Sequence, residues 1–386
     1  MRARLLSSIG FAAALALSLS CGGEKAPDAQ GIPIGFYGAL TGPTATFAIS
    51  GRNGVMLAAD ELNRSGGVLG RPIHVLAEDD RGEASEAASV VSKLITRDHV
   101  VALIGEQASS RTLAAAPIAQ SYGVPMISPT STNVEVTKKG DYIFRACYID
   151  PYQGQASARF ARDTLGAKTA ALLVDVRSDY SVGLGEAFTQ AFRSLGGEVI
   201  AEEKYAEGDS DFSAQLTALR PKNADVLFVP GYYTDAGLIA RQARSLGLRS
   251  VLLGADGWDS PKLTEIGGAA MDGAYFANHY SVDDPAPDVR RFVADYTKRY
   301  GAAPDSIAAS SYDAMRMLAD AIVRAGSTEG KRVRDALAAT KDFAGVTGTI
   351  TMDSDRNPIK PIVILKVEGG KYVLAGKVES GGKSKQ

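Results

Sequence analysis

Residues on which disulfides, metal sites and nucleophilic catalysis depend are scarce in this chain. Of its 386 residues, two are cysteine and three are histidine, at positions 74, 99 and 279. A nucleophilic Cys147 would need a histidine partner, and the G-x-S-x-G, H-E-x-x-H and repeated C-x-x-C motifs are all missing. We therefore expect Cys147 to be a small buried residue, and the protein to be no enzyme and to carry no metal or cofactor.

The chain also has no marked excess of positive or negative side chains. Lysine and arginine number 42 against 44 acidic residues, a net charge of -2, and no basic block recurs. Nucleic-acid partners select clustered positive charge, so we expect none. Hydrophobic residues make up 45% and charged residues 22% of the chain, which is typical of a globular protein, and the length favours two domains.

The N-terminal segment is typical of an export signal. Two arginines precede an apolar stretch, 9–19, that is too short to span a bilayer. Cys21 then precedes two glycines, which resembles the processing site of bacterial lipoproteins, although a serine stands where leucine is usual three positions earlier. We expect residues 1–20 to be removed, Cys21 to be acylated and 21–31 to be a tether. Ordinary secretion with cleavage nearby is the alternative.

Strand-type apolar runs alternate with helical periodicities in two successive series. The first series has strands at 32–38, 73–78, 100–104 and 124–128 and helices at 51–63, 83–97 and 111–122. The second has strands at 169–176, 198–205, 224–229, 250–254 and 274–278, with helices between them. Helical crossovers join parallel strands, so we expect an α/β protein with two doubly wound lobes. Three further helices and a C-terminal β segment follow, at 286–300, 307–325, 331–339 and 348–375.

Two clusters of hydroxyls stand just beyond strands of the first series. Ser109 and Ser110 fall in the turn before the helix at 111–122, and residues 130–132, Thr-Ser-Thr, follow the next strand. The free backbone N–H groups and the dipole of a helix N-terminus form a cradle for a carboxylate or phosphate. Helix capping and turn formation are the alternative use of these hydroxyls.

Side chains of another kind follow the strands of the second series. Tyr180, Tyr232 and Asp256 each lie just past a strand end, where open α/β sheets bind their ligands. The two sets together suit a zwitterion, with its carboxylate on Ser109 and Thr132, its ammonium on Asp256 and the tyrosines closed over it. For either tyrosine alone, a half-buried aromatic at a strand end is the alternative.

Five motifs occur in order along the chain: Gly38-Ala-Leu-Thr-Gly-Pro43, Asn63-Arg-Ser-Gly-Gly-Val-Leu-Gly-Arg-Pro72, Ile127-Ser-Pro-Thr-Ser-Thr132, Asp211-Phe-Ser213 and Gly254-Ala-Asp-Gly-Trp258. Together they resemble the leucine/isoleucine/valine-binding protein family, the substrate-binding components of branched-chain amino acid ABC importers. The similarity runs from about residue 32 to residue 374. It implies the type I periplasmic binding protein fold, an α/β fold of two doubly wound lobes joined by a three-crossover hinge.

The resemblance also implies boundaries and site residues. Lobe 1 would comprise 32–149 and 281–352, lobe 2 would comprise 150–280 and 353–378, and 379–386 would be a tail. The hydroxyls of Ser109 and Thr132 match carboxylate ligands, and Asp256 matches the ammonium partner. The complete set of matching positions is Phe47, Ala108, Ser109, Thr130, Thr132, Tyr180, Tyr232 and Asp256.

These inferences predict an extracytoplasmic solute-binding component of an ABC importer. The ligand is a branched-chain or related amino acid, held between the lobes, and the partners are permease subunits. We expect a monomer that meets the membrane only through a lipid anchor. Glu106 and Gln107 are more polar than an aliphatic pocket needs, so polar amino acids, amides and small aromatic acids stay open as ligands. A sensor of the same fold and an exported α/β hydrolase are the alternative functions.

Overall fold

The computed structural model describes residues 31–378 and the backbone of residues 384 and 385. The expected signal, Cys21, most of the tether and most of the tail lie outside these residues. None of the described helices is both long and apolar enough to cross a membrane. Cys147 is buried and unpaired, and burial raises the pKa of its thiol to about 12. It therefore stays a neutral, unreactive thiol at physiological pH.

A five-stranded sheet forms the first half of the fold, and its strands are all parallel. Its spatial order is β2-β1-β3-β4-β5. The strands are β1 (Ile32–Gly38), β2 (Ile73–Asp79), β3 (Ala102–Ile104), β4 (Met126–Ser128) and β5 (Ile143–Arg145). The connecting helices are α1 (Ala45–Arg64), α2 (Ala84–Thr96), α3 (Ser109–Tyr122) and the short α4 (Glu135–Lys138). The predicted doubly wound α/β class is thus confirmed.

Helix α1 begins six residues before the predicted start at Gly51. Gly51, where the helix was predicted to begin, and Gly54 both lie inside the helix, at buried positions. A Cβ atom at Gly54 would overlap the backbone carbonyl of Ala308 on a late helix. The earlier start places Phe47 on the first turn of α1, one helical turn before Gly51.

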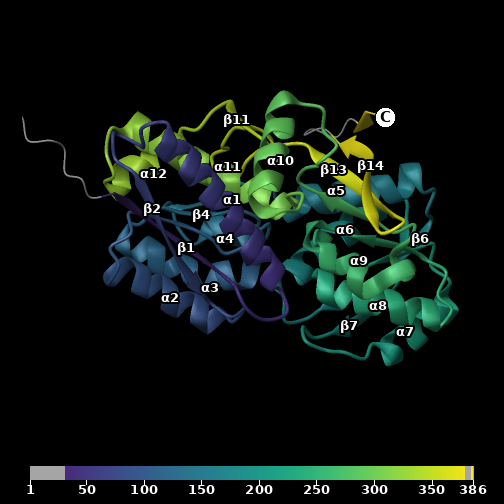
Figure 1. Cartoon of the computed structure of the whole chain (residues 1–386). Helices are drawn as coiled ribbons and strands as arrows, with labels where there is room; N and C mark the ends of the chain where they lie inside the picture. The colour runs from purple at the N-terminus through teal and green to yellow at the C-terminus, as the bar shows by residue number, and fades with distance from the viewer. Residues whose placement is uncertain (1–30, 379–383, 386) are drawn as a thin grey trace, which may run out of the picture. The chain divides into compact units, whose positions relative to one another are not determined.

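Three late helices pack with the first sheet. They are α10 (Pro287–Tyr300), α11 (Ser306–Ala325) and α12 (Gly330–Ala338). One apolar core joins β1 and β3 to α1, α10, α11 and α12, and a separate core joins the sheet to α2 and α3. Figure 1 shows these two helical layers on opposite sides of the sheet, with α11 and α12 close to α1. The sheet is buried on both faces, as parallel sheets are.

The second sheet has the order β15-β14-β13-β10-β9-β8-β6-β7. Strands β6 (Thr169–Asp175), β7 (Glu198–Tyr205), β8 (Val226–Phe228), β9 (Val251–Gly254) and β10 (Tyr275–Asn278) are parallel. The late hairpin of β13 (Ile362–Glu368) and β14 (Lys371–Val378) adds antiparallel strands beside β10, and β15 (Ser384–Lys385) pairs with β14. The helices are α5 (Asp150–Arg159), α6 (Asp179–Ser194), α7 (Ser213–Leu219), α8 (Tyr233–Ser245) and α9 (Pro261–Gly267).

The chain passes between the two halves more than once. It leaves the first sheet after β5, returns from β10 to α10, and leaves again after β11 (Phe343–Gly345) and β12 (Gly348–Ile350) to form β13. Strand β12 lies within the predicted β segment, whereas its antiparallel partner β11 was not predicted. These three crossovers bring the carboxyl ends of strands from both sheets to a common cavity.

Candidate ligand-binding site

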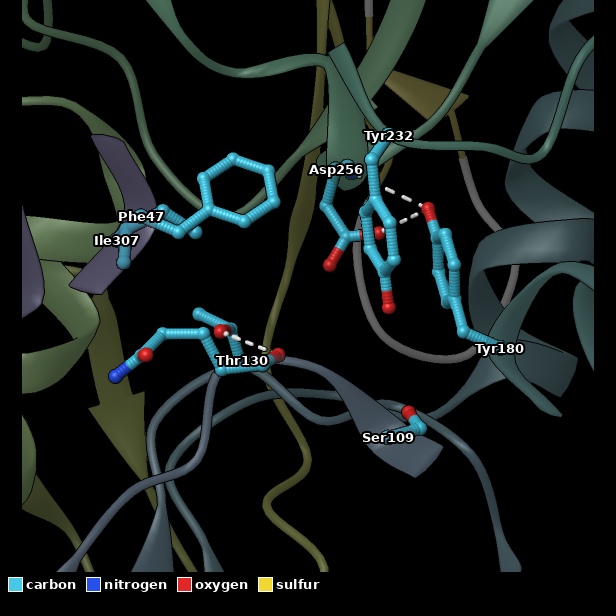
Figure 2. A pocket seen from close by; sticks show the side chains of 9 residues that line it. Phe47, Ser109, Thr130, Tyr180, Tyr232, Asp256 and Ile307 are labelled. Carbon is cyan, nitrogen blue, oxygen red and sulfur yellow. Dashed lines mark hydrogen bonds between the residues drawn. The ribbon is translucent and has the colours of Figure 1, made fainter. Parts of the chain in front are cut away.

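A cavity of about 240 Å³, counted with its mouth, lies where α1 and the β3–α3 loop approach loops of the second sheet. Figure 2 shows Phe47 and Ile307 on one side of it and Asp256, Tyr180 and Tyr232 on the other, with Thr130 and Ser109 below. The lining residues are Phe47, Gln107, Ser109, Thr130, Tyr180, Tyr232, Asp256, Gly257 and Ile307. The rule that ligands bind past strand ends therefore identified most of this wall.

Two of the predicted residues do not line the cavity. Ala108 is buried and precedes the first residue of α3, with its backbone N–H donated to Glu106. Thr132 is fully buried, and its carbonyl accepts a hydrogen bond of 3.0 Å from the N–H of Asp150. The carboxylate role predicted for Thr132 stays a prediction, whereas Ser109 faces the cavity.

The N-terminus of α3 approaches the cavity at Ser109. Ala108 has an extended backbone and α3 begins at Ser109, so the amides of its first turn have no carbonyl within the helix to bind. Ser109 Oγ accepts from the backbone N–H of Asn133 at 3.2 Å, which fixes the loop after β4 beside the helix. Ser109 thus combines a hydroxyl with the positive end of a helix dipole, the chemistry that a carboxylate needs.

Asp256 supplies the opposite charge. Its Oδ1 accepts from Tyr180 Oη at 2.8 Å and from Gln153 Nε2 at 2.7 Å, and its Oδ2 lies 3.0 Å from His279 Nε2. Burial lowers the pKa of His279, so the ring is neutral and contributes a hydrogen bond rather than a charge. Burial also raises the pKa of Tyr180 and keeps its hydroxyl a donor. Among residues 31–378, Asp256 is held in place with no lysine or arginine paired to it.

Gln153 and His279 were missed as partners of Asp256. His279 follows β10 directly, so the strand-end rule could have identified it. Gln153 lies inside α5, more than 100 positions before Asp256, and no local pattern connects them. Only the fold brings these three side chains together.

Stacked and edge-packed aromatic rings close the cavity. Tyr180 and Tyr232 stack with their centroids 5.3 Å apart and an interplanar angle of 8°. Phe47 meets Tyr232 edge-on at 5.7 Å, so an aromatic of α1 contacts one from the second half of the fold. A Cβ atom at Gly257 would lie 2.7 Å from the carbonyl oxygen of Gly231, so glycine is needed there for this close packing.

Glu106 does not line the cavity, although it adjoins Gln107. Its Oε1 accepts from Ala39 N–H at 3.3 Å and its Oε2 lies 3.1 Å from Arg111 Nε. Burial opposes the charge of Arg111, but the charges of Glu106 and of further acidic groups nearby together outweigh it and raise the pKa of the guanidinium. Arg111 also donates to Gly82 O and Thr44 Oγ1, at 3.2 and 3.1 Å. This ion pair, which was not predicted, holds the loops behind the cavity wall.

Direct hydrogen bonds join loops of the two halves around the cavity. Thr46 Oγ1 and Ser260 Oγ lie 2.9 Å apart, and Thr234 Oγ1 donates to Pro43 O at 2.8 Å. On another edge, Asn133 Nδ2 donates to the carbonyl of Asp179 at 2.7 Å. These hydrogen bonds close the edges of the cavity in this structure.

Comparison with known proteins agrees with this geometry. The family described as "Periplasmic binding protein" matches residues 31–371. A leucine-binding protein, LivK, from Thermotoga maritima superposes with a TM-score of 0.87 at 38% identity, covering 90% of this chain and 99% of that one. LivJ of Streptococcus pneumoniae, a branched-chain amino acid transporter substrate-binding protein solved with isoleucine, gives 0.85 at 34%, covering 92% and 100%. A leucine-, isoleucine-, valine-, threonine- and alanine-binding protein of Pseudomonas aeruginosa is 30% identical, over 84% of this chain and 86% of its own length.

Proposed function

The chain belongs to the periplasmic binding protein family, and on this premise we propose that it is the extracytoplasmic solute-binding component of an ABC importer for a small amino acid. The cavity sets a helix N-terminus opposite a carboxylate, and these complement the two charges of a zwitterion. Ser109 and the N-terminus of α3 face the ligand carboxylate, and Asp256 faces its ammonium. The observation that carries the proposal is the position of Asp256 across one cavity from that helix end. In the described part of the chain, the donors to this buried carboxylate are the neutral side chains of Gln153, Tyr180 and His279.

The energetics suit an amino acid. A micromolar ligand needs about 8 kcal/mol of binding free energy. Two charge-assisted anchors in a desolvated cleft, together with apolar contact from Phe47 and Ile307, are of a size to supply it. The proposal also draws on the relatives, since LivJ was solved with isoleucine and the Pseudomonas protein is named for five small amino acids.

Hinge closure is the proposed mechanism. We take 32–149 with 281–352 as one lobe and 150–280 with 353–378 as the other, and let the three crossovers between them act as the hinge. The ligand meets Ser109 on the first lobe, and the contacts with Asp256 and the tyrosines exist only when the lobes close. Because these contacts differ between open and closed forms, the ligand shifts the equilibrium toward the closed form.

The remaining proposals concern location and partners. The protein would be exported by the signal at 1–20, acylated at Cys21 and tethered to a membrane as a monomer. Its closed form would then present a surface to permease subunits. Palmitate labelling of the wild type and of Cys21→Ala would test the anchor, which requires label on the wild type alone.

Calorimetry on the wild type and Asp256→Asn tests the ligand class. We expect the variant to bind the tightest amino acid of a standard panel about 10- to 100-fold more weakly, because a charge-assisted hydrogen bond to the ammonium is lost. Asp283→Asn, which removes an exposed carboxylate, is the matched control and should bind as the wild type does. Undiminished affinity of Asp256→Asn would refute the ammonium assignment.

A further inference from the structure

One short turn after β9, residues 256–260, carries Asp256 at its start and Asp259 near its end. It begins with a single 3-10 turn, Asp256–Trp258. Trp258 fixes it to the second half of the fold, because its ring is buried and its Nε1 donates to Val229 O at 3.1 Å. A contact made at the end of this turn therefore bears on the position of Asp256 at its start.

Asp259 contacts the first half of the fold. It is 4% exposed, and its Oδ2 accepts from the backbone N–H of Ser306 at 2.7 Å. Ser306 is the first residue of α11, so this N–H has no carbonyl within the helix to bind. The same Oδ2 accepts from Asn278 Nδ2 at 2.8 Å, within the second half. Asp259 thus joins the two halves through one buried carboxylate oxygen.

Ser260, the last residue of the turn, contacts a second helix of the first half. Its Oγ lies 2.9 Å from Oγ1 of Thr46, in the first turn of α1. Phe47, the next residue of α1, lines the cavity, as does Ile307, the residue after Ser306 (Figure 2). Each contact of the turn with the first half therefore lies one residue from a side chain of the cavity wall.

We propose that Asp259 is a positioning residue for amino-acid binding: the hydrogen bond that it accepts from Ser306 forms when the halves close, and it holds Asp256 opposite the cavity wall of the first half. The inference rests on the proposed function and its hinge closure. A contact made in the closed form alone raises the closed fraction, and the observed dissociation constant varies inversely with that fraction. Asp259 does not line the cavity, so it tightens binding by slowing release rather than by touching the amino acid.

The affinity and release rate of Asp259→Ala test the proposal. The probe is whichever standard amino acid binds the wild type most tightly. We expect the variant to bind it about 5- to 10-fold more weakly, the range of one lost hydrogen bond, with most of the change in the release rate. Stopped-flow fluorescence of Trp258, the one tryptophan of the chain, measures that rate. Asp259→Asn keeps an oxygen that can accept from Ser306, so it should bind within about twofold of the wild type.

Asp305→Ala is the matched control for loss of a helix cap. Asp305 caps the same helix from within the first half, where its Oδ1 accepts from the N–H of Ala308 at 2.8 Å and from Ser50 Oγ. These bonds do not cross between the halves. The variant should therefore have a lower melting temperature but an affinity and release rate within about twofold of the wild type.

Thr46→Val keeps the test decisive even if Asp259→Ala does not fold. It removes the contact with Ser260 and keeps a side chain of similar shape. We expect it to bind the same probe about two- to fivefold more weakly, because one of the contacts that the turn makes with the first half is lost.

The outcomes separate this inference from the proposed function. If Asp259→Ala and Thr46→Val both keep the wild-type affinity and release rate, the positioning role is refuted while amino-acid binding stands. The same holds if Asp305→Ala weakens binding as much as Asp259→Ala, because loss of a cap on α11 would then explain the effect. If the wild type binds no standard amino acid, the proposed function fails and the inference fails with it.

Discussion

Two buried carboxylates lie beside the cavity on opposite walls, and they differ in their hydrogen-bond and ion-pair partners. Glu106, in the loop after β3, is paired with Arg111 and also accepts backbone N–H groups. Asp256, in the loop after β9, is held by Tyr180, Gln153 and a neutral His279. Within residues 31–378, its ion-pairing neighbours include no lysine or arginine.

The difference distinguishes a structural carboxylate from a binding one. Glu106 has its own cation and turns away from the cavity, so its charge stabilises the loops. The hydrogen-bond donors of Asp256 orient its carboxylate but carry no positive charge. A cationic group of a ligand can therefore form an ion pair with it. Glu106 and Gln107, which are adjacent in the chain, also differ in whether their side chains have partners within the protein. The carboxylate is fully used within the protein, and the carboxamide beside it is not.

Breaking the ion pair between Glu106 and Arg111 should have the largest effect on stability. We expect Arg111→Met to lower the free energy of unfolding by about 3–5 kcal/mol, because it leaves Glu106 buried without its cation. Urea denaturation measures this loss. Arg332→Met removes an exposed partner of Glu329 and should change stability by less than about 0.5 kcal/mol. Combining Arg111→Met with Glu106→Gln should recover part of the loss, and a single-variant loss below about 1 kcal/mol would contradict this account.

Removing a hydrogen bond that orients Asp256 should have a smaller effect, and this effect should be on ligand affinity rather than on stability. Tyr180→Phe removes the 2.8 Å hydrogen bond to Asp256 Oδ1 and keeps the ring stacked on Tyr232. We expect ligand affinity to fall by about 1.5–3 kcal/mol, since the lost bond involves a charged acceptor. Calorimetry with the tightest amino acid measures the change. Tyr152→Phe, on an exposed tyrosine of α5, should bind as the wild type does, and equal affinity in both variants would argue against the orienting role.

A further expected effect concerns the pH dependence of stability. Asp150 lies near Asp256, and burial, reinforced by the charge of Asp256, raises its pKa to about 8. The unfolded chain releases this proton near pH 4, whereas the folded protein retains it, so this group's contribution to stability falls as the pH rises from about 4 to about 8. Asp150→Asn should flatten the pH dependence of the unfolding free energy over that range, by up to about 1.4 kcal/mol for each pH unit.

Unfolding curves at several pH values measure this slope. Asp288→Asn, at an exposed position of α10, should keep the wild-type slope. A variant slope for Asp150→Asn equal to that of the wild type would show that Asp150 is ionised in the folded state.

Much of the fold could be predicted because its signals are local. Alternating strand and helix patterns require only a few consecutive residues, and helical crossovers dictate parallel strands. The start of α1 was predicted too late, at Gly51. Glycines are unfavourable inside a helix, but Gly54 of α1 permits close contact with α11, which follows some 250 positions later.

The residues of the site also fall into those that local patterns identify and those that depend on long-range packing. Strand ends are visible in the sequence, so Ser109, Tyr180, Tyr232 and Asp256 could be named before any coordinates. Gln153, the partner of Asp256, could not, because it lies inside α5 and its contact with Asp256 depends on long-range packing.

The sequence by itself therefore determined the α/β class, the two series of strands and the strand-end residues of the cavity. Tertiary structure alone decided which polar groups are used within the protein and which remain for a ligand. The physical reason is that the neighbours of a buried polar group in space decide whether its hydrogen bonds and charge are satisfied within the protein. Glu106 and Gln107 are adjacent in the chain, but only the tertiary structure pairs Glu106 with Arg111 and leaves the carboxamide of Gln107 beside Gly38 and Gly51 without a partner among the described residues.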